Sequence, residues 1–157
     1  MANSFKLKPM TARDLSLLPP DLKKFLELWE SKRQGRLMPR RSDFTVEEFT
    51  PWLGRLHLVR VEGENDGDGR YIVFATRSAE RYGREMTGKL LSQFEPEEMA
   101  ARALEDHFRI LRERGPTYSE INDTFGPLLM HWSRLSLPLS DDGQRIDRYL
   151  VALHYFL

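Results

Sequence analysis

Cysteine does not occur in this 157-residue chain, and its absence excludes several kinds of chemistry. Without thiols there can be no structural disulfide, no thiolate metal site, no cysteinyl-flavin adduct and no cysteine nucleophile. Haem attached through a Cys-x-x-Cys-His motif is excluded for the same reason. A function that depends on a thiol is therefore ruled out.

Long hydrophobic runs and an excess of charge of one sign are also absent. Apolar stretches are too short to cross a bilayer, and residues 1–8 lack the apolar core of a signal peptide. Lys and Arg together number 24, as do Asp and Glu, so no net charge favours non-specific binding to nucleic acid. We expect a cytoplasmic protein without a nucleic-acid or membrane partner. A basic segment with Arg36, Arg40 and Arg41 could bind phosphate or an acidic surface, but a solvated charge run is the simpler interpretation.

The length suits one domain with a core of its own, and its hydrophobic pattern predicts several helices. The first carries one apolar stripe at helical spacing, made of Leu22, Phe25, Leu26 and Trp29. A capping-box spacing predicts a short helix over 46–52, and Ser78 can cap another. The longest helix is expected over about 96–114, with His107 near the centre of its apolar face and Arg109 on the opposite face.

Five extended segments complete the pattern, at 56–61, 71–75, 117–123, 128–139 and 145–156. Asp142-Gly143 lies between the last two and is a strong hairpin signal. This order favours an antiparallel sheet with helices mainly on one face, an α+β arrangement. The final segment is apolar on both alternations, so both of its faces need cover. Either the first helix or a partner subunit would have to cover the second face.

Three ordered stretches resemble a family of short, stand-alone PAS-domain proteins of proteobacteria. They are Trp29 with Gly35-Arg36-Leu37-Met38-Pro39-Arg40-Arg41, then Arg81-Tyr82-Gly83-Arg84-Glu85-Met86-Thr87-Gly88, and Leu135-Ser136-Leu137-Pro138-Leu139-Ser140-Asp141-Asp142-Gly143. The resemblance extends from about residue 22 to the end. It implies a PAS-like five-stranded antiparallel sheet with helices on one face. The expected organisation is an N-terminal arm at 1–18, an N-terminal helical extension at 19–54 and a PAS-like domain at 55–157.

The resemblance also implies a cavity between the sheet and the middle helices. Such cavities hold haem, flavin or a small metabolite, or stay empty, and the family fixes none of these, so the cofactor is unknown. We expect no effector segment after Leu157. We therefore expect the output to pass through a separate effector protein or through a homodimer.

Three side chains are candidate ligand contacts, His107, Tyr82 and Tyr118. Each of them also has a simpler structural explanation. Haem-binding PAS domains place an axial histidine on the helix that corresponds to 96–114, where His107 lies. A half-buried histidine bonded to a neighbour is the alternative. Tyr82 and Tyr118 could offer hydroxyls to a ligand, although tyrosines more often pack their rings and leave the hydroxyl in water.

Trp132 and Arg134 share one alternation of the fourth extended segment. If this alternation faces inward, the planar fork of Arg134 could pair with a ligand carboxylate or phosphate. Arginine is rarely buried, which favours the solvent face, with a carboxylate such as Glu120 or Asp147 paired across the strands. Periodicity does not decide which face lines the cavity.

The resemblance implies a sensory module that binds a small ligand and signals through protein contacts. A ligand-free interaction domain is the alternative, with the stripe of the first helix serving either in a dimer or in packing on the sheet. No catalytic motif is present, and the four histidines lack metal-ligand spacing. We expect neither an enzyme nor a metal site. A small cone-fold isomerase, with Glu120 or Asp123 beside a tyrosine, is a weaker third candidate.

Overall fold

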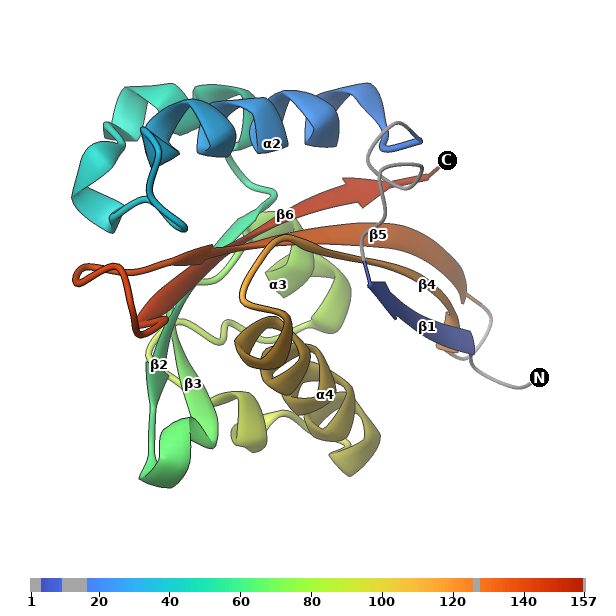
Figure 1. Cartoon of the computed structure of the whole chain (residues 1–157). Coiled ribbons are helices and arrows are strands. Elements are labelled where there is room, and N and C mark those ends of the chain that lie inside the picture. Colours follow the sequence, from blue (N-terminus) through green and yellow to red (C-terminus); the bar gives the residue numbers. More distant parts are fainter. Residues whose placement is uncertain (1–3, 10–16, 126–127, 157) are drawn as a thin grey trace.

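A six-stranded antiparallel sheet runs through the molecule in the order β1-β4-β5-β6-β2-β3 (Figure 1). The computed structural model describes residues 4–9, 17–125 and 128–156. The strands are β1 (Ser4–Pro9), β2 (Leu56–Glu62), β3 (Asp68–Val73), β4 (Thr117–Phe125), β5 (Leu128–Leu139) and β6 (Arg148–Tyr155). The five predicted strands are β2 to β6, and the α+β architecture is confirmed. β1 adds a sixth strand beside β4 from within the segment expected to be an arm. Residues 10–16 of that arm lie outside the described residues.

Helices cover both faces of this sheet. Figure 1 shows α2 on one side and α3 with α4 on the other. The α-helices are α2 (Pro20–Arg33), α3 (Thr76–Tyr82) and α4 (Glu97–Glu113), and the 3₁₀ helices are η1 (Arg41–Asp43), η2 (Val46–Trp52), η3 (Glu64–Asp66) and η4 (Leu91–Gln93). The helix predicted over 46–52 is thus a 3₁₀ helix, and it contains Pro51, which lacks the N–H that an α-helix interior needs. Ser78 lies inside α3 instead of capping it.

The apolar stripe of α2 packs on the sheet within the same chain. Leu22, Phe25, Leu26 and Trp29 are all buried, and α2 contacts β5 and β6. The indole Nε1 of Trp29 donates a buried hydrogen bond to the Pro138 carbonyl of β5 over 2.8 Å. The second face of β6 is therefore covered by the first helix, which settles the choice between that helix and a partner subunit.

On the other side of the sheet, α4 is the longest helix, as the sequence predicts. Its first turn carries Glu97 and Glu98, whose charges favour a helix N-terminus. Its buried face includes two charged residues, Asp106 and Arg109. The expectation that Arg109 faces solvent is wrong. Its side chain is buried and Nη1 donates to the Tyr118 carbonyl at 3.2 Å, an acceptor supplied by β4.

Within residues 4–9, 17–125 and 128–156, no helix combines the length and apolar character needed to cross a membrane.

Replacing Trp29 with Phe tests the packing of α2 on the sheet. The change keeps an aromatic ring but leaves the buried Pro138 carbonyl without its donor, which should lower the free energy of unfolding by about 1–3 kcal/mol. Urea unfolding followed by circular dichroism measures the difference. Leu53→Ala is the control, because Leu53 is 65% exposed and should change stability by less than about 0.5 kcal/mol. Equal stabilities of Trp29→Phe and the control would contradict this packing.

Candidate functional site

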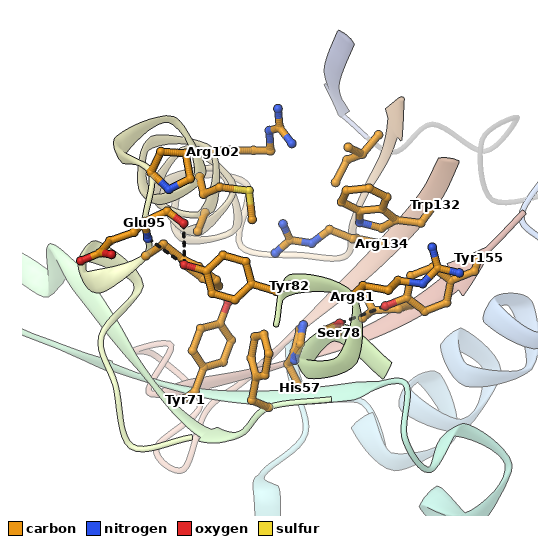
Figure 2. Close-up of a pocket in the computed structure, with 17 residues that line it drawn as sticks. His57, Tyr71, Ser78, Arg81, Tyr82, Glu95, Arg102, Trp132, Arg134 and Tyr155 are labelled. Carbon is orange, nitrogen blue, oxygen red and sulfur yellow. Dashed lines mark hydrogen bonds between the residues drawn. The ribbon is translucent and has the colours of Figure 1, made fainter. Parts of the chain in front are cut away.

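A cavity of about 400 Å³ lies between the inner face of the sheet and the helices α3 and α4 (Figure 2). Seven aromatic rings form much of its wall: His57, Tyr71, Phe74, Tyr82, Phe94, Trp132 and Tyr155. Its aliphatic wall residues include Met99, Ala103, Ile121 and Leu153. Its charged wall residues are Arg81, Glu95, Arg102 and Arg134. The cavity thus combines apolar walls with a small number of polar groups, the usual composition of a ligand pocket.

Strand pairing places one alternation of β5 in this cavity. Ile121 of β4 pairs with Trp132, and Tyr155 of β6 pairs with Trp132 from the other side. Directly paired residues point to the same face of a sheet, and all three line the cavity. Arg134, two residues beyond Trp132, has the same orientation. The face that periodicity left open is therefore the one that carries Trp132 and Arg134.

Arg134 forms a buried ion pair with α4. Its Nη2 lies 2.9 Å from Oδ2 of Asp106, and the two side chains are 13% and 4% exposed. Burial opposes the charge of Arg134, but the Asp106 carboxylate acting together with Tyr71, Tyr149 and Tyr155 outweighs this effect, and the pKa of Arg134 is raised. The favoured expectation, an exposed Arg134 paired with Glu120 or Asp147, is wrong. Its partner, Asp106, lies on the helix α4. The alternation of residues along a strand does not predict a contact with a helix.

His57 is a wall residue that sequence reasoning did not select. Its Nδ1 accepts a hydrogen bond from the Ala75 amide at 2.9 Å, and its ring stacks on Phe74 with centroids 4.7 Å apart. Burial, together with the positive charge of Arg134, lowers the pKa of His57 to about 3. The neutral ring therefore carries its proton on Nε2 and is a donor in the cavity wall. In the sequence, His57 is a lone histidine in an apolar strand. That pattern does not distinguish a donor in a cavity wall from a histidine that only packs.

The α3 side of the cavity is held by contacts between side chains and backbone. The Tyr82 hydroxyl donates to the Glu95 carbonyl at 2.6 Å and accepts from the Glu95 amide at 2.8 Å. Arg81 places its guanidinium 4.2 Å from the centroid of the Tyr155 ring, and the Tyr155 hydroxyl is hydrogen-bonded to Ser78 at 3.0 Å. Tyr82 thus lines the cavity, but its hydroxyl is committed to the backbone that closes this side.

Two predicted contacts lie outside the cavity wall. His107 Nε2 donates to the Asp66 carbonyl and Nδ1 accepts from the Tyr149 hydroxyl, both at 2.8 Å. Burial outweighs the hydrogen bond to Asp66 and lowers the pKa of His107. Both ring nitrogens are engaged, so neither is left to ligate haem iron. Tyr118 is on the alternation of β4 opposite to Ile121 and donates to Glu120 at 3.2 Å. We therefore remove His107 and Tyr118 from the candidate site.

The basic segment after α2 makes internal contacts. Nη2 of Arg36 lies 2.5 Å from Asp43, and Nη2 of Arg40 lies 3.2 Å from the same carboxylate. Arg41 lies over the Phe49 ring at 5.3 Å. In the described part of the chain, no group of three His, Asp or Glu side chains has an arrangement that could hold a metal ion.

Comparison with known proteins gives a structural match only. The sequence matches no protein-family model and no curated protein. The fold is similar to that of the PAS domain of BvgS from Bordetella pertussis, with a TM-score of 0.53 and 14% identity. The match covers 66% of this chain and 76% of that domain. At this identity the likeness concerns the fold alone. The molecule has a PAS-like fold.

The depressed pKa of His57 predicts a dependence of stability on pH. The imidazole has a pKa of about 6.5 in the unfolded chain, whereas burial in the folded protein lowers the pKa of His57 to about 3. Between these values the unfolded state binds more protons, so the free energy of unfolding falls as the pH falls, by up to about 1.4 kcal/mol per pH unit for this one group. His57→Asn retains an acceptor for the Ala75 amide and should flatten the slope between pH 6.5 and 4. Urea unfolding over this range measures the effect, and parallel curves for the two proteins would contradict it.

Proposed function

We propose that this chain is a sensory module that binds a small molecule in the cavity and transmits its occupancy through contacts with another protein. The cavity of about 400 Å³ carries this proposal, because its apolar walls and convergent polar groups are typical of a binding pocket. The PAS-like fold supports the sensory class. We further propose that the protein is one of the stand-alone, cytoplasmic PAS-type modules that its motifs resemble, and that it is not an enzyme.

Two features favour a ligand over a ligand-free interaction domain. A domain that serves only for contacts has no need of an internal space, and well-packed interiors leave few voids larger than a water molecule. The second feature is the placement of charge. Arg134 lines the cavity while it is mostly removed from water, and burying an ion pair carries a desolvation penalty that packing alone does not require.

The surfaces left for a partner are limited by α2. The stripe of Leu22, Phe25, Leu26 and Trp29 is buried against the sheet, so a homodimer or an effector protein would use other surfaces. The cavity is bounded by α3 and α4, which lie on the opposite side of the sheet from α2 (Figure 1). We propose that a ligand acts on a partner through these two helices.

The isomerase alternative lacks a suitable acid in the cavity. Glu120 contacts Tyr118 and lies on the other face of β4, and Asp123 falls among residues whose side chains lie outside the described part of the chain. The wall carboxylate Glu95 is 78% exposed and pairs with Arg84 at 3.1 Å. Since the cavity offers no isolated buried carboxyl among its described wall residues, ligand sensing is the better supported function.

Filling the cavity tests this proposal. Neutral aromatic probes such as indole and 3-phenylpropanamide should bind the wild type saturably, measured by ligand-observed NMR. Ala103→Phe on α4 and Met99→Trp each add bulk to the wall and should weaken binding by at least about tenfold, a change of about 1.4 kcal/mol. Two variants are used because a ring at Ala103 can overpack the interior.

Leu53→Trp is the matched control, because it adds similar bulk at an exposed position outside the wall and should bind like the wild type. Circular dichroism checks that each variant is folded. Absence of saturable binding to the wild type, or unchanged binding in both filled variants, would contradict ligand binding in the cavity. It would favour the ligand-free interaction domain.

A further inference from the structure

We infer that the ligand is a small organic anion, a flat apolar body bearing one carboxylate, and that this carboxylate competes with Asp106 for Arg134. The inference rests on the proposed function, because it specifies the chemistry of the molecule that the cavity takes. It goes further, because it assigns Arg134 to the recognition of the ligand's charge and Asp106 to competition with the ligand for Arg134.

The charges around the cavity favour an anion. Three arginines line the wall, Arg81, Arg102 and Arg134, against one carboxylate, Glu95. Glu95 is itself paired with Arg84, which lies outside the wall. Arginines therefore outnumber carboxylates among the wall residues, while Asp106, outside the wall, offsets part of the charge of Arg134. A cleft with low-dielectric walls and an excess of charge of one sign concentrates ligands of the opposite sign.

Arg134 is the group best placed to hold the carboxylate. It lines the cavity with its side chain mostly removed from water, where an ionic hydrogen bond is stronger than at an exposed position. Figure 2 shows its guanidinium extending into the space between Arg102 and Tyr82. Asp106 contacts Arg134 at Nη2, whereas a guanidinium has five donors. Its Nε–H meets no acceptor among the described residues. Asp106 therefore leaves the donor fork of Arg134 only partly used.

The remaining wall fits a flat apolar body. The rings of Phe74, Phe94 and Trp132 offer faces and edges for aromatic contact. The neutral His57 ring supplies an Nε2–H donor, and burial raises the pKa of the Tyr71 hydroxyl, so this group also stays a protonated donor. A volume of about 400 Å³ is near the lower end of ligand pockets, which suits a molecule of metabolite size.

One negative charge suits this site better than two. Arg134 already shares its charge with Asp106 at 2.9 Å, so a dianion would add two charges beside a buried carboxylate. Like charges held close together in a site of low dielectric repel one another strongly. A carboxylate matches the single planar fork of Arg134, and it would have to displace Asp106 or share the guanidinium with it.

The test compares an acid with its neutral amide at pH 7.5. We expect 3-phenylpropionate to bind the wild type about 10- to 100-fold more tightly than 3-phenylpropanamide, as measured by titration calorimetry or NMR, because the hydrogen bond to Arg134 is charge-assisted. Inorganic phosphate should bind more weakly than the acid, because it makes no contact with the aromatic wall.

The decisive variant is Asp106→Asn. It removes the competing carboxylate and should tighten binding of the acid by about tenfold while leaving the amide unchanged. A role of Asp106 in structure alone would leave or weaken binding of the acid. Arg134→Gln should abolish the preference for the acid. Arg134→Gln leaves Asp106 buried without its partner and can unfold the protein. In that case the binding of the acid to Asp106→Asn still tests the inference. Arg112→Gln is the control, because Arg112 is exposed on α4 and lies outside the cavity wall, and it should keep the preference.

The outcomes separate the two proposals. Equal binding of acid and amide to the wild type overturns the anionic ligand, and unchanged or weaker binding of the acid to Asp106→Asn overturns its competition with Asp106. Tighter binding of inorganic phosphate than of the acid overturns the organic anion as well. If the amide binds the wild type but not Ala103→Phe, ligand binding in the cavity stands even when the anion inference fails. If no probe binds the wild type, both fail.

Discussion

The whole arrangement depends on one central strand that is apolar on both faces. Residues 149–153 of β6 are all buried, and β6 lies between β5 and β2 in the middle of the sheet. Because no side of this strand can face water, the chain must supply a layer on each face of the sheet. The α2 helix provides one layer, and α3 with α4 provides the other. The two layers differ in packing, and the cavity lies in the layer formed by α3 and α4.

The two layers differ in how completely they are packed. On the outer side, Leu135, Leu137 and Leu139 of β5 are fully buried beneath α2 and its neighbours. Phe25 packs on Trp52 with ring centroids 4.7 Å apart, and Asp21 at the start of α2 contacts His154 of β6 at 3.0 Å. On the inner side, the helices stand off from the sheet and leave a space walled by rings. There the Arg134–Asp106 pair joins strand to helix by charge instead of by close packing.

Sequence patterns predicted most of the helices and strands, and they predicted that both faces of the last strand would be covered. The stripe from Leu22 to Trp29 predicted α2, and the double alternation of the last strand predicted that both faces would be covered. Both signals are local or periodic, so they are visible in one sequence. The strand β1 was missed, because Ser4–Pro9 shows little periodicity and is defined by its pairing with β4.

The site was only partly accessible from the sequence. Trp132 and Arg134 were selected, but their orientation needed the register of β5 against β4 and β6. Asp106 was missed as a partner, since the contact joins residues 28 positions apart on a helix and a strand. His107 attracted attention through its place on an apolar helix face, yet its nitrogens are used by Asp66 and Tyr149. Hydrogen bonds between distant segments decided these roles, and no spacing rule encodes them.

The unequal packing of the two layers has a consequence for how this kind of protein can diverge. Substitutions in the wall reshape the cavity at modest cost, because the wall already borders empty space and is not required to fill it. Substitutions under α2 act on a close-packed interface, where a single lost methylene is felt. Selection can therefore change what the inner side recognises while the outer side preserves the fold. The similarity of this fold to the PAS domain of BvgS at 14% identity is consistent with a fold that is kept while the residues lining the cavity change.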